Sequence, residues 1–270
     1  MEKSKPSISI ITVNYNNRDG LHRTIESVMH QTTSDFEYII IDGGSDDGSK
    51  EEIDAVASRL DFAVSEPDGG IYEGMNKGVA HATGDYCLFL NSGDVLATND
   101  VMERVIAQID GTYDYYVGSM KREDWHKGVV RPPRCISASY LLIRSLPHQA
   151  MFIRRELLRK KGFDCHYRII ADWEQQVREI VLNDASYKRL DMTVSVFDIS
   201  GVSNNRQKES MAERERATSA LFSQSVADSL RGRDKLEAKL LYSLSKDNRF
   251  AKAMKIMGIG VKMLFASQPA

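Results

Sequence analysis

The first 90 residues alternate between short apolar runs and segments in which apolar side chains recur at helical spacing. The apolar runs predict strands at residues 7–13, 37–42, 61–65 and 86–90. The segments between them predict helices at residues 19–30, 49–60 and 71–82. The strands are apolar throughout rather than at every second residue, so the pattern predicts a parallel sheet with helices on both faces.

The pattern changes after residue 110. From residue 113 to 143 the runs are shorter and Pro132-Pro133 interrupts them, which favours an antiparallel or mixed edge. The later elements are predicted as helices at 155–161 and 172–182, one or two strands at 187–197, and helices near 207–228, 233–245 and 248–265. We therefore expect an α/β domain over residues 1–205, with halves at 1–110 and 111–205, and a helical extension over residues 206–270.

The charge of the chain is balanced as a whole but uneven along its length. The 270 residues are 42% apolar and 27% charged, which indicates a globular protein with a sizeable core. The formal net charge of −2 argues against nucleic acid as a partner. From Arg206 onward there are 13 Lys and Arg against 7 Asp and Glu, whereas residues 1–205 carry 23 against 31. The extension is therefore basic and the body acidic.

The cysteines and the apolar runs bear on the compartment. Cys87, Cys135 and Cys165 are odd in number and far apart, which favours neither a disulfide framework nor a zinc site. We interpret residues 7–13 as a first strand rather than an export signal. No run approaches the roughly 18 consecutive apolar residues of a membrane span. These features favour a cytoplasmic protein whose membrane contact, if any, is peripheral.

Polar residues follow each of the four predicted strands. In an open parallel sheet, ligands bind beyond the carboxyl ends of the strands, so these residues are the first candidates for a site. The four polar segments are Asn14-Tyr15-Asn16, Asp42 to Gly48, Glu66 to Gly70, and Asn91-Ser-Gly-Asp94.

Two of these segments carry candidate ligand chemistry. The carboxylates of the segment from Asp42 to Gly48 can accept from a nucleobase N–H or a ribose hydroxyl, but an N-capped turn explains it equally well. A calcium loop is disfavoured because the acid at the twelfth position is absent. The segment from Asn91 to Asp94 suits Mg²⁺ or Mn²⁺ beside a diphosphate, although a simple turn has the same residue types.

Four ordered motifs resemble those of family 2 glycosyltransferases. They are residues 9–16 (SIITVNYN), 42–48 (DGGSDDG), 65–78 (SEPDGGIYEGMNKG) and 82–94 (ATGDYCLFLNSGD). Residues 147–150, 170–174 and 196–203 continue the resemblance, which is closest to bacterial enzymes that build colanic acid, capsule and O-antigen. The resemblance implies a GT-A fold, with residues 111–205 as the acceptor half. It also implies inverting transfer from a nucleotide-sugar, most commonly a UDP-sugar, to a glycan or polyprenyl-diphosphate-linked acceptor.

The resemblance also implies roles for individual residues on the donor side. Asp42 and Asp68 would hold the nucleoside, with Tyr15 near its base. The diphosphate-sugar side would be supported by Asn76, Lys77 and Ser92. Asp94 matches the last acid of the family's Asp-x-Asp signature and, with Asn91, would bind Mn²⁺ or Mg²⁺. Many relatives have an acid near Asn91, so this chain offers fewer anionic ligands.

On the acceptor side, inversion by direct displacement needs a base for the acceptor hydroxyl proton. Asp172 is the candidate, although a helix-capping Asp is the plainer interpretation of this residue by itself. His148 would lie beside the diphosphate or the acceptor. Trp173 and Trp125 would stack on an acceptor sugar, or else simply bury apolar area.

Other activities and partners remain to be weighed. Residues 231–265 are basic and amphipathic, which fits an anionic membrane surface or packing against the body or a second subunit equally well. A dinucleotide oxidoreductase is disfavoured because no Gly-x-Gly-x-x-Gly follows the first strand. A sugar nucleotidyltransferase would need a Gly-rich loop that is also absent. A catalytically silent scaffold subunit stays open because of Asn91.

Overall fold

The computed structural model describes residues 7–123, 128–198, 206–224 and 226–227. Its strands are β1 (Ile8–Asn14), β2 (Glu37–Asp42), β3 (Phe62–Ser65), β4 (Tyr86–Phe89), β5 (Val95–Leu96), β6 (Tyr115–Arg122), β7 (Val129–Val130), β8 (Met151–Arg154) and β9 (Tyr187–Phe197). Its α-helices are α1 (Arg18–Met29), α2 (Ser49–Val56), α3 (Ile71–His81), α4 (Val101–Ile106), α5 (Ala138–Ile143), α6 (Arg155–Lys160), α7 (Ala171–Gln176) and α8 (Gln207–Leu221). Short 3₁₀ turns are η1 (Ala57–Arg59) and η2 (His148–Ala150), and α7 continues into a π-helix, η3 (Val177–Leu182).

The strands form a mixed sheet in the order β3-β2-β1-β4-β8-β6-β9-β5, with β7 paired to β6. The first four strands in this order are parallel. β8 runs antiparallel to both β4 and β6, and β9 is again parallel to β6. The predicted α/β fold with a mostly parallel sheet is therefore confirmed.

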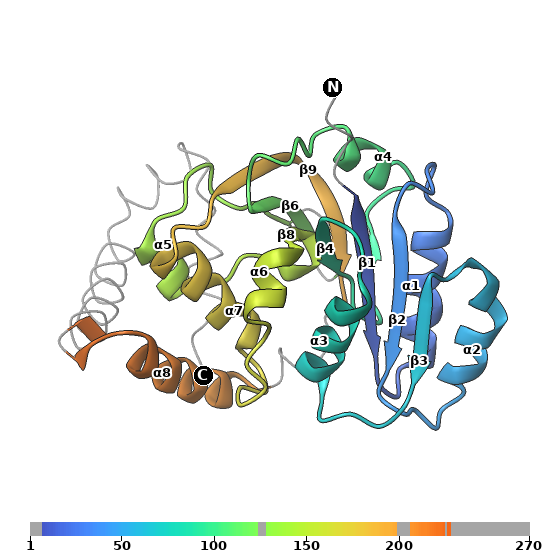
Figure 1. The fold of residues 1–270 in the computed structure, drawn as a ribbon, viewed down its shortest axis with the longest axis horizontal. Helices are drawn as coiled ribbons and strands as arrows, with labels where there is room; N and C mark the ends of the chain where they lie inside the picture. Colours follow the sequence, from blue (N-terminus) through green and yellow to red (C-terminus); the bar gives the residue numbers. More distant parts are fainter. Residues whose placement is uncertain (1–6, 124–127, 199–205, 225, 228–270) are drawn as a thin grey trace, which may run out of the picture. The chain divides into compact units, whose positions relative to one another are not determined.

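Helices cover both faces of the parallel part of the sheet, with α1 and α2 on one side and α3 on the other (Figure 1). Ile8 and Ile10 of β1 pack in one apolar cluster with Leu21 and Ile25 of α1. The alternate residue Ile11 lies against α3, where a Cβ on Gly78 would meet its side chain. Both faces of β1 are buried, which explains why its sequence is apolar throughout.

The structure confirms the predicted elements of the first 90 residues to within a few residues and corrects the region that follows. Residues 113–143 were expected at a sheet edge, but β6 lies in the interior between β8 and β9. This region also contains the helix α5, which the sequence did not predict, and β8 was missed as well. β6 is central because the antiparallel strand β8 returns between it and β4, a pairing that local sequence does not encode.

Contacts divide the chain into a first compact unit that ends at Glu215 and a second that begins at Arg216. The predicted boundary at residue 205 lies outside the described residues, as do Trp125 and the predicted helices at 233–245 and 248–265. Among the helices that the structure describes, none combines the length and apolar character needed to cross a membrane.

Candidate functional site

The parallel register of β1, β2 and β3 brings the carboxyl ends of these strands together. Asn14 lies beside Asp42, and Asp42 lies beside Ser65. The buried Asp42 carboxylate accepts hydrogen bonds from Asn14 Nδ2 (2.7 Å), Ser65 Oγ (2.6 Å), and the amide and hydroxyl of Ser45 (2.9 and 2.6 Å). Burial would raise the pKa of Asp42, but these bonds outweigh it and hold the pKa below its usual range. Asp42 thus stays ionised and organises the loop that follows β2.

Tyr15 and Asp68 lie beside this loop. A side chain placed on Gly43 would come within 3.3 Å of both Tyr15 Cδ2 and Asp68 Oδ1. Tyr15 is 68% exposed, so its side chain is accessible to a planar ligand. Asp68 Oδ1 also accepts a hydrogen bond from Gly70 N at 2.8 Å. Tyr15, Asp42 and Asp68, predicted together for the nucleoside, therefore meet at one edge of the sheet.

The segment from Asn91 to Asp94 forms a tight turn after β4. Asp94 N donates to Asn91 O at 2.9 Å, which closes the turn. Gly93 has a φ of +104° in the left-handed region, and a Cβ there would come within 2.5 Å of Asp198 Oδ2. Gly93 is thus required by both the backbone conformation and the approach of Asp198.

Within this turn, two buried oxygen atoms are candidate cation ligands. Asp94 is 4% exposed, and burial raises the pKa of its carboxyl to about 7. Asp94 Oδ1 accepts from Asp198 N at 3.0 Å, whereas the buried Asn91 Oδ1 has no hydrogen-bond partner among the described residues. Oxygen atoms of this kind suit a hard divalent cation that keeps waters and takes phosphate oxygens as its other ligands. No group of three or more His, Cys, Asp or Glu within the described segments could hold a metal alone.

His148 and Asp172 form a hydrogen-bonded pair beside this turn. His148 Nδ1 lies 3.2 Å from Asp172 Oδ2, and His148 Nε2 lies 3.5 Å from Asn91 Nδ2. The Tyr72 hydroxyl lies 2.9 Å from the other Asp172 oxygen. The side chains of His148 and Asp172 are 23% and 15% exposed, so the pair is partly open to solvent.

The two members of this pair shift each other's pKa. Burial would lower the pKa of His148, but the hydrogen bond and negative charge of Asp172 outweigh it and raise the pKa. Burial would likewise raise the pKa of Asp172, but the hydrogen bond and charge of His148 outweigh it and lower the pKa. A carboxylate that orients an imidazole and stabilises its charged form is the arrangement by which His serves as a proton acceptor.

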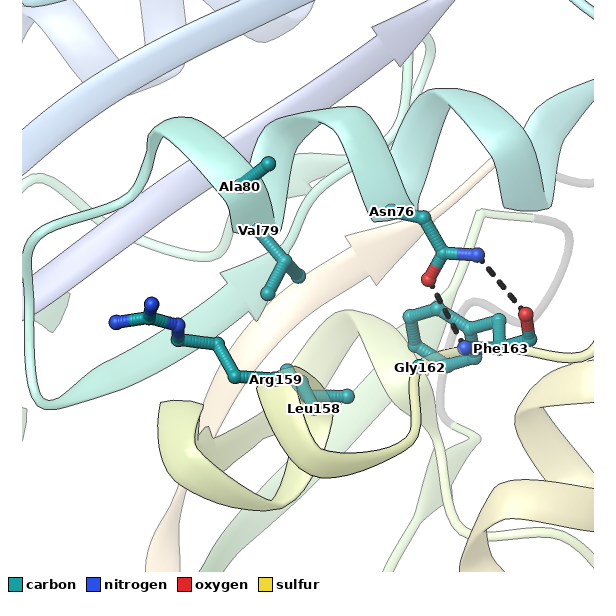
Figure 2. Close-up of a pocket in the computed structure, with 7 residues that line it drawn as sticks. All are labelled: Asn76, Val79, Ala80, Leu158, Arg159, Gly162 and Phe163. Carbon is teal, nitrogen blue, oxygen red and sulfur yellow. Dashed lines mark hydrogen bonds between the residues drawn. The ribbon is translucent and has the colours of Figure 1, made fainter.

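The three remaining donor-side candidates have partners in the protein. Asn76 Nδ2 donates to Phe163 O and Asn76 Oδ1 accepts from Phe163 N, both at 2.9 Å (Figure 2). The Asn76 amide therefore points to the loop after α6 and lines a hollow of about 360 Å³ between α3 and α6. Lys77 Nζ lies 3.0 Å from Glu66 Oε1, beside the segment that carries Asp68. Ser92 O accepts from Asn17 Nδ2 at 3.1 Å.

Trp173 does not offer a stacking surface in this structure. Its side chain is 1% exposed, and its indole N–H donates to Leu141 O at 2.6 Å. The Arg214 guanidinium lies 4.7 Å from the ring centroid. The interpretation of Trp173 as an acceptor platform is thus corrected, because the ring is buried in the scaffold that carries Asp172.

Three contacts of the candidate site were missed by reasoning from the sequence. Asn14 and Asp198 stand in motifs that the resemblance covers, but only their contacts with Asp42 and Asp94 show what they do. Tyr72 is 100 positions from Asp172, so no local pattern could have paired them.

Comparison with known proteins shows the family of the chain. The profile described as "Glycosyl transferase family 2" matches residues 9–173. An uncharacterised glycosyltransferase of Mycobacterium tuberculosis is 34% identical over 216 residues, which cover 76% of this chain and 79% of the relative. A PGL/p-HBAD biosynthesis glycosyltransferase of Mycobacterium bovis is 32% identical over 64% of this chain and 69% of its own length.

Solved structures show the same fold. Residues 1–349 of Staphylococcus aureus TarS in complex with UDP superpose with a TM-score of 0.63 at 20% identity, covering 83% of this chain and 69% of that TarS chain. The mannosyltransferase PcManGT of Pyrobaculum calidifontis, in complex with GDP-Man and Mn²⁺, gives 0.56 at 16% identity, covering 98% and 89%. The GT-A type fold that the resemblance implied is confirmed. With a family profile that matches well over half of its length and its strand-end motifs gathered at one edge of the sheet, the chain belongs to glycosyl transferase family 2.

Proposed function

We propose that this protein transfers a sugar, with inversion, from a nucleotide-sugar to an acceptor hydroxyl. The observation that carries the proposal is the gathering of three groups at one edge of the sheet. Tyr15 and Asp68 flank the loop held by Asp42, Asp94 and Asn91 form the turn after β4, and the His148–Asp172 pair lies against that turn. These three groups follow one another in the same order as the nucleoside, the diphosphate and the reacting carbon along a donor molecule.

Asp94 and Asn91 would hold Mn²⁺ or Mg²⁺ together with the diphosphate of the donor. The buried Asp94 carboxylate and the Asn91 amide oxygen, which has no hydrogen-bond partner in the described part of the chain, fit such an ion. PcManGT is a structural neighbour solved with Mn²⁺. When bound, the ion would stabilise the negative charge of the departing diphosphate.

The His148–Asp172 pair would receive the acceptor proton. When the His148 Nδ1–H donates a hydrogen bond to Asp172, Nε2 carries the lone pair on the side of Asn91. The acceptor O–H would give its proton to Nε2 while its oxygen bonds to the anomeric carbon and the bond from that carbon to the diphosphate breaks. Both Asp172 oxygens have protein partners, so we assign Asp172, first considered as the base itself, to orienting His148 and stabilising its charged form.

The proposed donor is a UDP-sugar, and the proposed acceptor is a glycan or a polyprenyl-diphosphate-linked glycan at the cytoplasmic membrane face. Support comes from a relative named for PGL/p-HBAD biosynthesis and from TarS, which was solved with UDP. The product would be part of a cell-surface polysaccharide or glycolipid.

The test compares UDP binding and turnover in four proteins: the wild type, Asp94→Ala, His148→Gln and Asp172→Asn. UDP affinity is measured by calorimetry with and without Mn²⁺, and turnover as UDP release from a panel of UDP-sugars. We expect Asp94→Ala to abolish the Mn²⁺-dependent gain in UDP affinity, because it removes the only carboxylate of the predicted ion site. His148→Gln and Asp172→Asn should bind UDP normally and lose about 100-fold or more in turnover.

Asp100→Asn serves as a matched control, since Asp100 lies between β5 and α4, outside the proposed site. Normal turnover in both His148→Gln and Asp172→Asn would overturn the proposed base. A wild-type protein that binds UDP with Mn²⁺ but releases none from any donor or acceptor would instead favour the silent scaffold subunit.

A further inference from the structure

We propose that Glu213 and Arg214 of α8 are positioning residues for the His148–Asp172 pair. The inference rests on the proposed function and adds residues from outside the family profile, which ends at residue 173. The two residues are consecutive in α8. Glu213 contacts the segment before Asp172, and Arg214 contacts residues near both His148 and Asp172.

Glu213 binds the backbone just before α7, the helix that carries Asp172. Its Oε1 accepts from Arg168 N and its Oε2 from Ile169 N, both at 2.9 Å. Glu213 is 6% exposed, so these charge-assisted bonds are largely shielded from water. α7 has no side-chain cap at its own N-cap residue, Ile170. The Glu213 carboxylate therefore holds the backbone that leads into α7, at a helix start where the N-cap residue itself supplies no side-chain hydrogen bond.

The segment that Glu213 holds also reaches the Asp172 carboxylate directly. Ile169 O lies 2.8 Å from the Tyr72 hydroxyl, and the same hydroxyl lies 2.9 Å from Asp172 Oδ1. The single hydroxyl proton is divided between these two acceptors. A shift of Ile169 would change how strongly Tyr72 binds Asp172, so the position of Glu213 is coupled to the charge and orientation of that carboxylate.

Arg214 contacts a residue near each member of the pair. Its guanidinium lies 4.7 Å from the Trp173 ring centroid, next to Asp172 in the chain, and its Nη2 donates to Ser145 Oγ at 2.7 Å. Ser145 lies three residues before His148. Arg214 thus links the segment before His148 to the residue after Asp172. This link helps to keep His148 Nδ1 and Asp172 Oδ2 at their distance of 3.2 Å.

The test uses the full chain with three variants at these positions. Glu213→Gln keeps the shape but can accept only one of the two N–H groups, Glu213→Ala accepts neither, and Arg214→Met keeps the apolar stem without the charge. Glu209→Gln and Arg206→Met are matched controls, because these residues form an exposed pair 3.6 Å apart, with Arg206 directly before α8 and Glu209 in its first turn.

The measured quantities are UDP affinity with Mn²⁺, the kcat and KM for UDP release from the best UDP-sugar of the panel, and the melting temperature. We expect kcat to fall about 10- to 100-fold in Glu213→Ala and Arg214→Met, and less in Glu213→Gln, because the reacting groups lose alignment. UDP affinity should stay within about twofold of the wild type, since the nucleoside side is not touched. The two control variants should keep wild-type kcat.

The decisive readout is the double variant Glu213→Gln with Asp172→Asn. If Glu213 acts through Asp172, Glu213→Gln should add little to the loss that Asp172→Asn causes by itself. The inference is overturned if kcat is unchanged in the α8 variants, if their losses multiply with that of Asp172→Asn, or if UDP affinity falls in parallel with kcat. A wild type without UDP-sugar turnover would count against the proposed function instead.

Discussion

At the scale of single residues, Asn76 lies in a motif predicted for the donor side, yet its contacts join two parts of the protein. Its amide bonds both the N–H and the C=O of Phe163, 87 positions away. A Cβ on Gly162 would clash with Asn76 Oδ1, so the loop can approach the amide only because residue 162 is glycine. The Asn76 side chain therefore connects α3 to the loop after α6.

We expect Asn76→Ala to lower the free energy of unfolding by about 1–3 kcal/mol, because it removes both bonds and leaves the Phe163 backbone groups unpaired. UDP affinity should be unchanged. Chemical denaturation and calorimetry measure the two quantities, with the exposed Asn99→Ala as a control. If Asn76→Ala instead loses UDP affinity at full stability, Asn76 belongs to the diphosphate side, as its motif first suggested.

The residue types of the site were largely predictable, but their partners were not. Asp42 and Asp94 could be identified because each follows an apolar strand, and the carboxyl ends of parallel strands share an edge. Asp172, by contrast, was identified through the resemblance alone. The bonds from Tyr72 and His148 to Asp172 depend on the path of the chain between them, which a local pattern does not contain.

At the scale of elements, Asp114 fastens three strands where β6 begins. It accepts from the amide and hydroxyl of Ser186, just before β9, at 2.9 and 2.6 Å. It also accepts from Arg154 Nε, at the end of β8, at 2.9 Å. Burial would raise the pKa of Asp114, but the bonds from Ser186 and Arg154 outweigh it and lower the pKa. The ionised carboxylate thus contributes to holding β6, β8 and β9 together.

A pKa that is lower in the folded state than in the unfolded chain contributes stability above the unfolded value of about 4, and the contribution is lost as the pH falls through the folded value. We expect Asp114→Asn to lower the free energy of unfolding at pH 7 by about 1–3 kcal/mol. The difference from wild type should shrink as the pH is lowered from about 5 toward 3, because a protonated Asp resembles Asn. Urea denaturation across this range measures it.

The exposed Asp35→Asn is the matched control and should track the wild type at every pH. A constant difference between wild type and Asp114→Asn over the whole range would show that the loss comes from the acceptor oxygen that the substitution removes and not from the charge of Asp114.

The elements could be predicted where sequence and topology agree. In residues 7–90 each of the first three strands is followed by a helix, and all four strands pair in parallel, so the apolar pattern identifies both kinds of element. β8 is only four residues long and runs antiparallel between β4 and β6. β3 and β4 are equally short, but they continue the series of parallel strands and helices, which β8 does not; without β8, β6 was misplaced at an edge.

At the scale of the whole molecule, charge separates the body from the carboxyl-terminal residues. Residues 1–205 carry 23 Lys and Arg against 31 Asp and Glu, whereas the residues from 206 onward carry 13 against 7. Nine of these basic residues lie between positions 231 and 265, interleaved with apolar ones. A basic, amphipathic sequence of this kind suits the surface of an anionic membrane, where a lipid-linked acceptor would be held.

We expect the full chain to co-sediment with phosphatidylglycerol vesicles and not with phosphatidylcholine vesicles. Each Lys or Arg near an anionic surface contributes about 1 kcal/mol, so replacing Lys246, Lys252, Lys255 and Lys262 with Gln should weaken binding by several kcal/mol. A matched set of substitutions, Lys50, Arg59, Lys160 and Lys161 to Gln, removes the same charge from the body and should leave vesicle binding unchanged. UDP affinity should be the same in all three proteins, and added salt should weaken vesicle binding. Equal vesicle binding by the two substituted proteins would assign the basic segment to packing within the protein or against a second copy.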